Sequence, residues 1–129
     1  MTQAVLDASA VLTLLKGERG ASRVAGVIAD ASVCSFSQAE VISHFVHLGA
    51  PLGGVRAMLA ALPYAVVAAG DALAWEAGHL HAPTASAGLS FGARFCLALP
   101  RRVGASAYMA DKTWRNIAAD VGVRVVVVR

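Results

Sequence analysis

The amino-acid sequence predicts an α/β fold in which helices cover both faces of an open, mainly parallel β-sheet. Short apolar segments typical of strands alternate with longer segments whose apolar residues recur at helical spacing. The C-terminal run Val123–Val128 is rich in β-branched residues, and Val125–Val128 within it is apolar on both faces, as expected for a strand between two layers of helices. Repeated alternation of this kind favours parallel pairing with right-handed crossovers. The 129 residues suffice for one domain, residues 1–129, and leave no room for a second.

The first two expected strands lie in the N-terminal third. Ala4–Leu6 is a brief apolar strand, and a helical segment extends from it to Lys16. Val24–Ile28 keeps helical spacing, Ser32–Ser35 is the second strand, and Ser37 begins the next helix. The apolar face of that helix comprises Val41, Ile42, Phe45 and Val46.

The middle of the chain contains a third expected strand. A helix over Val55–Leu62 ends at Pro63, and the strand Tyr64–Ala68 follows. Asp71 is placed to cap the N-terminus of a further helix that contains Leu73, Trp75 and Leu80.

The C-terminal part supplies the remaining elements. His81–Gly88 is the most loop-like segment of the chain. We expect a helix over Ser90–Leu99, a strand over Ser106–Met109, a helix over Lys112–Ala119 and a final strand over Val123–Val128.

Composition excludes several classes of protein. With 57% hydrophobic and 15% charged residues, the chain is too apolar to be disordered. The apolar stretch Ala57–Gly70 is broken by Pro63 and is shorter than the roughly 18 residues of a membrane span. Asp7 interrupts the N-terminal run, so no secretory signal is expected. Cys34 and Cys96 lack metal-like spacing, which predicts reduced core thiols in the cytoplasm. The net charge of +3 suits a polyanionic partner.

Three of the eight acidic residues fall at one rim of the predicted sheet. Asp7 directly follows the first strand, Asp111 follows the fourth, and Glu40 lies in the first turn after the second. Ligands of open parallel sheets bind beyond the carboxyl ends of the strands. Each acid also has a structural explanation, because Asp7 and Asp111 could cap helices and Ser37 with Glu40 matches a capping box.

The convergence of three acids favours a cation. Two carboxylates 4 Å apart repel each other by about 4 kcal/mol at an effective dielectric constant near 20. A divalent cation removes this repulsion, and Mg²⁺ favours a few carboxylates together with waters and a phosphate. Such a site suits the hydrolysis of phosphodiesters.

Four segments in this order resemble one known family. They are Val5–Ala10, Ser37–Glu40, Gly88–Arg94 and Ala110–Trp114, and together they span essentially the whole chain. They resemble the PIN-domain ribonucleases, specifically the VapC toxins of bacterial type II toxin–antitoxin systems. The resemblance implies a single PIN-like three-layer domain with a central parallel sheet of about five strands and helices on both faces.

The resemblance also implies an activity and partners. In this family, acidic residues at four such positions bind Mg²⁺ or Mn²⁺ and cleave single-stranded or structured RNA, often tRNA. By motif match, Asp7, Glu40 and Asp111 would be the catalytic, metal-binding acids, and Ser9 would support them through a hydrogen bond. The implied partners are RNA, a VapB-type antitoxin whose C-terminal segment lies over the active site, and a second copy in a homodimer.

One position departs from the family pattern. Ala93 occupies the place of the aspartate in the Gly-Leu-Ser-x-Gly-Asp-Arg motif, and a methyl group cannot bind a metal. Because the loss of an outer supporting group already costs about 10–100-fold in metal affinity or activity, the loss of a ligand should cost more. We therefore expect this chain to be inactive or weakened. Alanine here is natural or a deliberate replacement, and the matching Gly92 and Arg94 favour replacement. Met109, where the family often has threonine, is a smaller departure.

Five of the eleven basic residues lie between positions 94 and 115: Arg94, Arg101, Arg102, Lys112 and Arg115. They could hold an RNA backbone or form a solvated face. Trp114 could stack on a base, although core packing is the stronger expectation. Glu40, His44 and His47 share one helical stripe, but the absence of a fourth matched ligand makes a zinc site the weaker interpretation.

The leading hypothesis is a metal-dependent endoribonuclease. The alternative is a degenerate, non-catalytic PIN module that binds RNA or its antitoxin without cutting either. A phospho-acceptor receiver domain fits poorly, because that site needs adjacent acids after the first strand and Asp7 stands alone.

Overall fold

The computed structural model describes residues 3–117 and 121–129. At its centre lies a five-stranded sheet, with order β3-β2-β1-β4-β5 and every pair parallel. The strands are β1 (Ala4–Leu6), β2 (Ala31–Cys34), β3 (Ala65–Val67), β4 (Ser106–Met109) and β5 (Val125–Val127). The predicted α/β class and parallel sheet are therefore confirmed.

The order of the strands reverses between β1 and β4. From β1 the chain moves outward through β2 to β3, then returns to the other side of β1 to form β4 and β5. Ala4 of β1 pairs with Ala31 of β2 and with Ser106 of β4. The Asp7 N–H donates to the Tyr108 carbonyl at 2.9 Å, so the carboxyl ends of β1 and β4 emerge side by side. This is the point at which open α/β sheets bind ligands.

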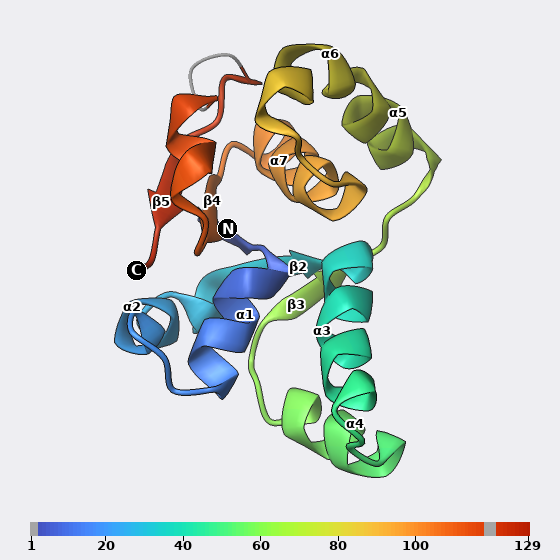
Figure 1. Ribbon diagram of the computed structural model, residues 1–129, viewed down its shortest axis with the longest axis vertical. Helices are drawn as coiled ribbons and strands as arrows, with labels where there is room; N and C mark the ends of the chain where they lie inside the picture. Colours follow the sequence, from blue (N-terminus) through green and yellow to red (C-terminus); the bar gives the residue numbers. More distant parts are fainter. Residues whose placement is uncertain (1–2, 118–120) are drawn as a thin grey trace.

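Helices cover both faces of the sheet (Figure 1). The helices before β3 are α1 (Ala8–Leu15), α2 (Ala21–Ala25), the 3₁₀ turn η1 (Ile28–Asp30), α3 (Ser35–His47) and α4 (Leu52–Ala60). Those after it are α5 (Asp71–His79), α6 (His81–Thr84), the 3₁₀ turn η2 (Ala85–Ala87), α7 (Phe91–Val103) and the 3₁₀ helix η3 (Lys112–Asn116). In the view of Figure 1, α5, α6 and α7 lie above the sheet, and α1 and α2 lie below it.

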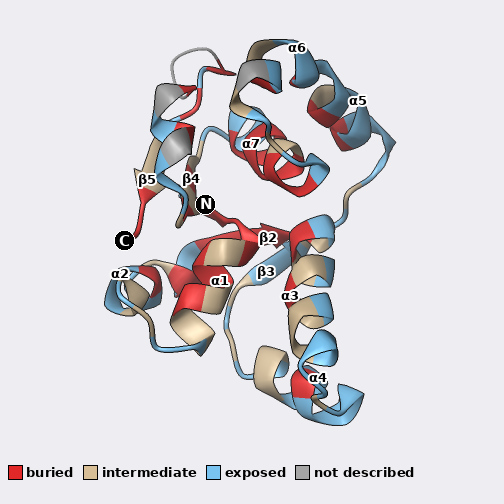
Figure 2. Cartoon of the chain, viewed as in Figure 1, coloured by how far each residue is buried: buried red, intermediate tan, exposed pale blue. Residues whose placement is uncertain are grey.

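Two apolar clusters fill the space between the layers. Val5 of β1 packs with residues of α5 and α7, whereas its neighbours Ala4 and Leu6 pack with residues of α1, α2 and α3. This alternation follows from the pleat of a strand that is covered on both faces. Figure 2 shows the buried residues concentrated on α7 and the central strands.

The edges of the sheet differ from the expectation for the C-terminal run. β5 is an edge strand with Val125 and Val126 only half-buried, so the pattern of burial on both faces belongs to β1 and β2 instead. Within this run only the C-terminal end is fully packed, because Val127 and Val128 are buried. At the other edge, Val66 of β3 is 49% exposed.

Several expected elements were wrong in kind or in their bounds; α4, for example, spans Leu52–Ala60 and not Val55–Leu62. His81–Gly88 is helical in α6 and η2, because Pro83 lies in the first turn of α6, where proline removes no helical hydrogen bond. α3 begins at Ser35 rather than Ser37, and α7 continues through Pro100 to Val103. The expected helix Lys112–Ala119 is a 3₁₀ helix over Lys112–Asn116, and residues 118–119 of that expectation lie outside the described residues.

Two further findings concern the described residues only. Among them, no helix is both long enough and apolar enough to cross a bilayer. Cys34 and Cys96 are both buried and neither forms a disulfide.

Candidate functional site

A cavity of about 490 Å³ opens beyond the carboxyl ends of β1 and β4. Asp7, Glu40 and Asp111 all line it, and so does Ala93. The structure therefore brings together the three acids and the alanine that the sequence singled out. We call this space the acid cavity; its other lining residues are Ala8, Ser9, Leu12, His44, Ala87, Gly88, Leu89, Ser90 and Trp114.

Asp7 is fixed by the first turn of α1. Its carboxylate Oδ2 accepts hydrogen bonds from the Ser9 N–H at 3.2 Å and from the Ser9 hydroxyl at 2.7 Å. The same hydroxyl oxygen accepts from the N–H of Ala110 at 3.0 Å. Ser9 thus connects the end of β1 to the residue before Asp111, and Asp7 is a helix cap and a cavity residue at once.

Burial makes the charge of Asp7 costly. The side chain is only 9% exposed, and this desolvation raises its pKa above the usual range. The hydrogen bonds from Ser9 and Ala8 partly oppose the rise, and the charge of Asp111 adds to it. A cation in the acid cavity would stabilise the ionised form.

Glu40 approaches the cavity from α3 across the backbone of α7. A β-carbon built on Gly92 would stand 2.2 Å from Glu40 Oε1, so the absence of a side chain at position 92 is what gives Glu40 its place. Burial raises the pKa of Glu40, and the charge of Asp7 raises it further. Its buried Oε1 has no hydrogen-bond partner among the described residues.

The capping-box explanation for Glu40 was wrong. α3 begins two residues before Ser37, with Cys34 at the N-cap position. Ser37 is therefore inside the helix, and its buried hydroxyl has no partner in the part of the chain described. Glu40 was expected in the first turn of α3, but because the helix begins at Ser35, Glu40 lies in its second turn.

Asp111 and Ala93 complete the rim. Asp111 lies between β4 and η3 and is exposed to solvent. Ala93 is 7% exposed and lies in the first turn of α7, where its N–H donates to the Ser90 hydroxyl at 3.3 Å. Because Ala93 already lines the cavity, an aspartate at position 93 would lie at the cavity wall.

The donor set fits a hard divalent cation that keeps part of its water shell. Carboxylate oxygens suit Mg²⁺ and Mn²⁺, and the unpartnered Glu40 Oε1 is an available donor. Within residues 3–117 and 121–129, no group of three His, Cys, Asp or Glu side chains is placed to hold a metal ion directly, the three acids of the acid cavity included, so these acids would have to hold a cation partly through water. That finding also argues against the zinc interpretation of Glu40, His44 and His47, of which His47 is exposed.

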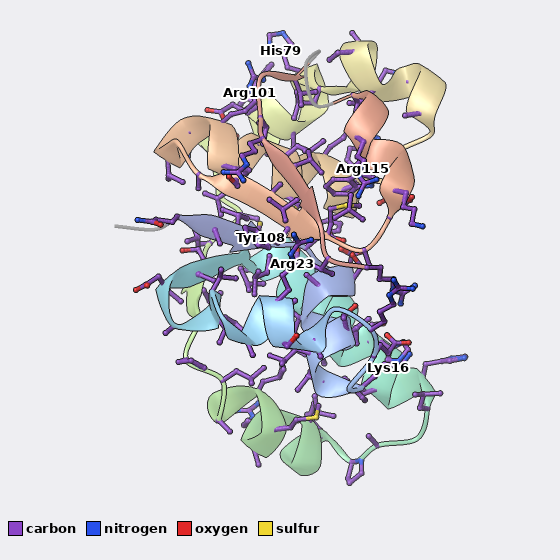
Figure 3. The ribbon with its side chains drawn as sticks, turned by 90° about the vertical axis from the view of Figure 1, so that its left-hand side faces the viewer. Lys16, Arg23, His79, Arg101, Tyr108 and Arg115 are labelled. Carbon is purple, nitrogen blue, oxygen red and sulfur yellow. The ribbon has the colours of Figure 1, made fainter. Side chains whose placement is uncertain are left out.

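The five basic candidates do not form one cluster. Arg94 lies beside Ala93, with its guanidinium 4.3 Å from the centre of the Phe91 ring. Arg101 is seven residues beyond Arg94 along α7, which corresponds to about 10 Å of helix. Figure 3 shows Arg101 well away from Arg115. Arg102 forms an ion pair with Glu76 at 2.9 Å on the same distant part of the molecule.

Other side chains have roles that the sequence left open or missed. Trp114 is 3% exposed and belongs to the apolar core, so the packing interpretation holds. His44 lines the acid cavity with a buried Nε2 that has no partner among described residues. The spacing of Glu40 and His44 on one helix could have indicated this, whereas nothing in the sequence signalled the contact between Gly92 and Glu40.

Comparison with known proteins identifies the fold. No protein-family model matches the sequence, and no curated protein matches it. Among solved structures, a chain of a toxin–antitoxin complex from Klebsiella pneumoniae superposes with a TM-score of 0.74 and 14% identity, covering 98% of both chains. A chain of a DNA-bound VapBC from Salmonella typhimurium gives 0.73 and 14%, covering 100% of both.

A third similarity agrees with these two. A chain of VapBC2 from Rickettsia felis, bound to a promoter DNA fragment, superposes with a TM-score of 0.71 and 11% identity over 97% of this chain and 98% of that one. The protein therefore has the PIN-like fold that the resemblance implied.

Proposed function

We propose that this protein is a VapC-type PIN-domain toxin: a metal-dependent endoribonuclease that cleaves phosphodiester bonds in tRNA or another structured RNA. The convergence of Asp7, Glu40 and Asp111 on one cavity carries this proposal. The fold adds support, because its structural neighbours belong to VapBC and toxin–antitoxin complexes. A VapB-type antitoxin is accordingly the proposed neutralising partner.

In the proposed mechanism, Asp7, Glu40 and Asp111 would hold Mg²⁺ or Mn²⁺ together with water. Such an ion, when bound, would supply Lewis acidity toward the phosphate and polarise a water molecule. Ser9 holds the Asp7 carboxylate in place through its hydroxyl, and the bare α-carbon of Gly92 admits Glu40. Arg94, placed beside the cavity and half-buried, would contact a phosphate oxygen of the substrate.

Ala93 weakens this site. Three carboxylates instead of four leave less negative charge to hold a cation, so metal affinity and cleavage should both be reduced. The same residue favours the second candidate function, a PIN module that binds RNA or antitoxin without cutting either.

Cleavage assays on both forms separate the two functions. We would incubate the chain and its Ala93→Asp variant with tRNA and Mn²⁺, with Ala93→Asn as the control of equal shape and no charge. The nuclease proposal expects Ala93→Asp to cleave more than about 10-fold faster than the other two. If all three forms bind RNA but none cleaves it, the binding module is the correct function.

The proposal includes a homodimer in the cytoplasm. Large apolar side chains are exposed among the described residues, which suits contact with a second copy or an antitoxin: Phe36, Val46, Leu48, Leu52, Val66, Trp75, Phe91 and Val103. Light scattering coupled to size-exclusion chromatography measures the mass directly, and a monomer at micromolar concentration would refute the dimer.

A further inference from the structure

A second depression adjoins the acid cavity. It has a volume of about 660 Å³ and is lined by Ser9, Arg19, Ala110, Asp111, Lys112 and Arg129. We call it the basic hollow. Ser9 and Asp111 line both spaces, so the basic hollow begins where the acid cavity ends.

The basic hollow joins three segments that are far apart in the sequence. Arg19 lies in the connection between α1 and α2, which is pressed against the end of β5. At Gly20, with a φ of +101°, a β-carbon would stand 2.2 Å from the Val128 carbonyl oxygen. The Arg23 guanidinium donates to the Val127 carbonyl at 3.0 Å, a contact on the side of the molecule shown in Figure 3. Arg19 is thereby held beside the C-terminal strand.

The cations of the basic hollow differ in their partners. Arg129 is already engaged, because its guanidinium lies 3.2 Å from the Glu18 carboxylate. Arg19 and Lys112 are exposed, and among residues 3–117 and 121–129 neither has an ion-pair or hydrogen-bond partner. Two cations with no ion-pair partner among the described residues thus stand beside a cavity lined by three acids, one of which, Asp111, also lines the basic hollow.

The phosphate backbone of an RNA strand fits this arrangement, in which an acidic site lies next to a basic one. An RNA phosphate at the acid cavity needs a bound cation to offset the carboxylates, whereas the next phosphate along the strand meets cations of the protein itself. Arg and Lys side chains bind phosphates directly and release the counterions that surround the nucleic acid. A small monoanion could occupy the basic hollow but would not explain why it continues into the acid cavity.

We propose that Arg19 and Lys112 bind the RNA phosphate that neighbours the one at the acid cavity. This inference rests on the proposed ribonuclease function for the identity of the ligand. It adds a subsite that fixes which way the strand leaves the acid cavity. Arg19 is part of it although it lies far from the basic residues that the sequence singled out.

The test measures binding without cleavage. A fluorescein-labelled single-stranded RNA of 12 nucleotides would be titrated in a fixed concentration of Ca²⁺, which offsets the carboxylates, by fluorescence anisotropy between 50 and 200 mM KCl. The variants are Arg19→Gln, Lys112→Gln and their combination. Arg56→Gln is the matched control, because Arg56 is an exposed arginine on α4, outside both spaces.

Each substitution should weaken binding and reduce the salt dependence. Loss of one phosphate contact lowers the slope of log K against log salt by about 0.7 for a single strand, so the fourfold change in salt weakens each variant about 2.5-fold less than the unaltered chain. The double variant should lose about twice that slope, and Arg56→Gln should lose nothing.

Three results would overturn the subsite: unchanged slopes in Arg19→Gln and Lys112→Gln, an equal loss in Arg56→Gln, or tighter binding of a 12-base-pair DNA duplex than of the RNA. The outcome is separable from the ribonuclease proposal. Reduced slopes combined with an Ala93→Asp form that does not cleave would keep the subsite and refute the nuclease. Restored cleavage with unchanged slopes would do the opposite.

Discussion

Alanine at position 92 should drive Glu40 out of the acid cavity. The new β-carbon would lie 2.2 Å from Glu40 Oε1 and 2.6 Å from its Cδ. Because unstrained contacts between heavy atoms are about 3.5–4.0 Å, the carboxylate must retreat by about 1 Å or more. Glu40 has a flexible side chain, so we expect it to swing away while α3 and α7 stay in contact.

The loss of stability in Gly92→Ala is best measured against the same substitution at a second glycine. Gly78 lies in α5, where a β-carbon would meet nothing within 4 Å. Gly78→Ala should therefore gain up to about 1 kcal/mol of helix propensity. Gly92→Ala should be less stable than Gly78→Ala by about 1–3 kcal/mol, the cost of overpacking, with the low end favoured because Glu40 can move. For a chain of this size, 1 kcal/mol corresponds to about 3–5 °C in Tm.

Two measurements test the reasoning. Urea denaturation of Gly92→Ala, Glu40→Ala and the double variant gives a coupling energy. It should equal the overpacking cost of about 1–3 kcal/mol, because removing the carboxylate removes the clash and leaves only the helix-propensity gain of alanine. NMR titration of the Glu40 carboxyl in Gly92→Ala should show its pKa move back toward the usual value as the group leaves its buried place. If Gly92→Ala costs the same with and without the Glu40 carboxylate, the clash is not the cause.

Three further predictions concern the acid cavity. Burial raises the pKa of Asp7 and Glu40, so the folded protein binds protons more readily than the unfolded chain and loses stability as pH rises from the usual pKa to the raised one. Asp7→Asn should therefore gain urea stability relative to the unaltered chain at about pH 7 and lose that advantage at about pH 4; a constant difference would contradict this. Ala93→Asp should lower stability without metal but gain more from Mn²⁺, by about 2.7 kcal/mol at 100 times its Kd, and equal Mn²⁺ responses in Ala93→Asn would exclude position 93 from a metal site. Ser9→Ala should cost about 1–3 kcal/mol, because the buried Asp7 loses a donor and the Ala110 N–H loses its acceptor. The exposed Ser22→Ala should stay within about 0.5 kcal/mol, and equal urea midpoints for these two serine variants would refute that role for Ser9.

The strands and the position of the site were predictable from the sequence because both depend on local patterns. β1 and β4 have the expected boundaries, since each is a short apolar run. Parallel pairing then places the residues after those strands at one edge, so Asp7 and Asp111 meet without any knowledge of side-chain contacts.

The rest depends on contacts that no local pattern encodes. Cys34 provides no capping side chain, so no residue pattern marks the start of α3. Pro83, Ser86 and Gly88 are typical of loops, yet the proline falls in a first turn of α6 and the glycine ends η2 with a φ of +65°. Arg101 is near Arg94 in sequence but far along α7, whereas Glu18 and Arg129 meet across 111 residues.

The pairing of β1 with β4 has a consequence during synthesis. Ala4 of β1 pairs with Ser106 of β4, which is synthesised about a hundred residues later. One side of β1 therefore stays unpaired until most of the polypeptide has left the ribosome. Pairings this distant in sequence close slowly and late. Asp7 and Asp111 flank the β1–β4 pairing, so the two acids cannot become neighbours before β4 has been made. While the chain is being translated, the acid cavity is therefore not yet assembled.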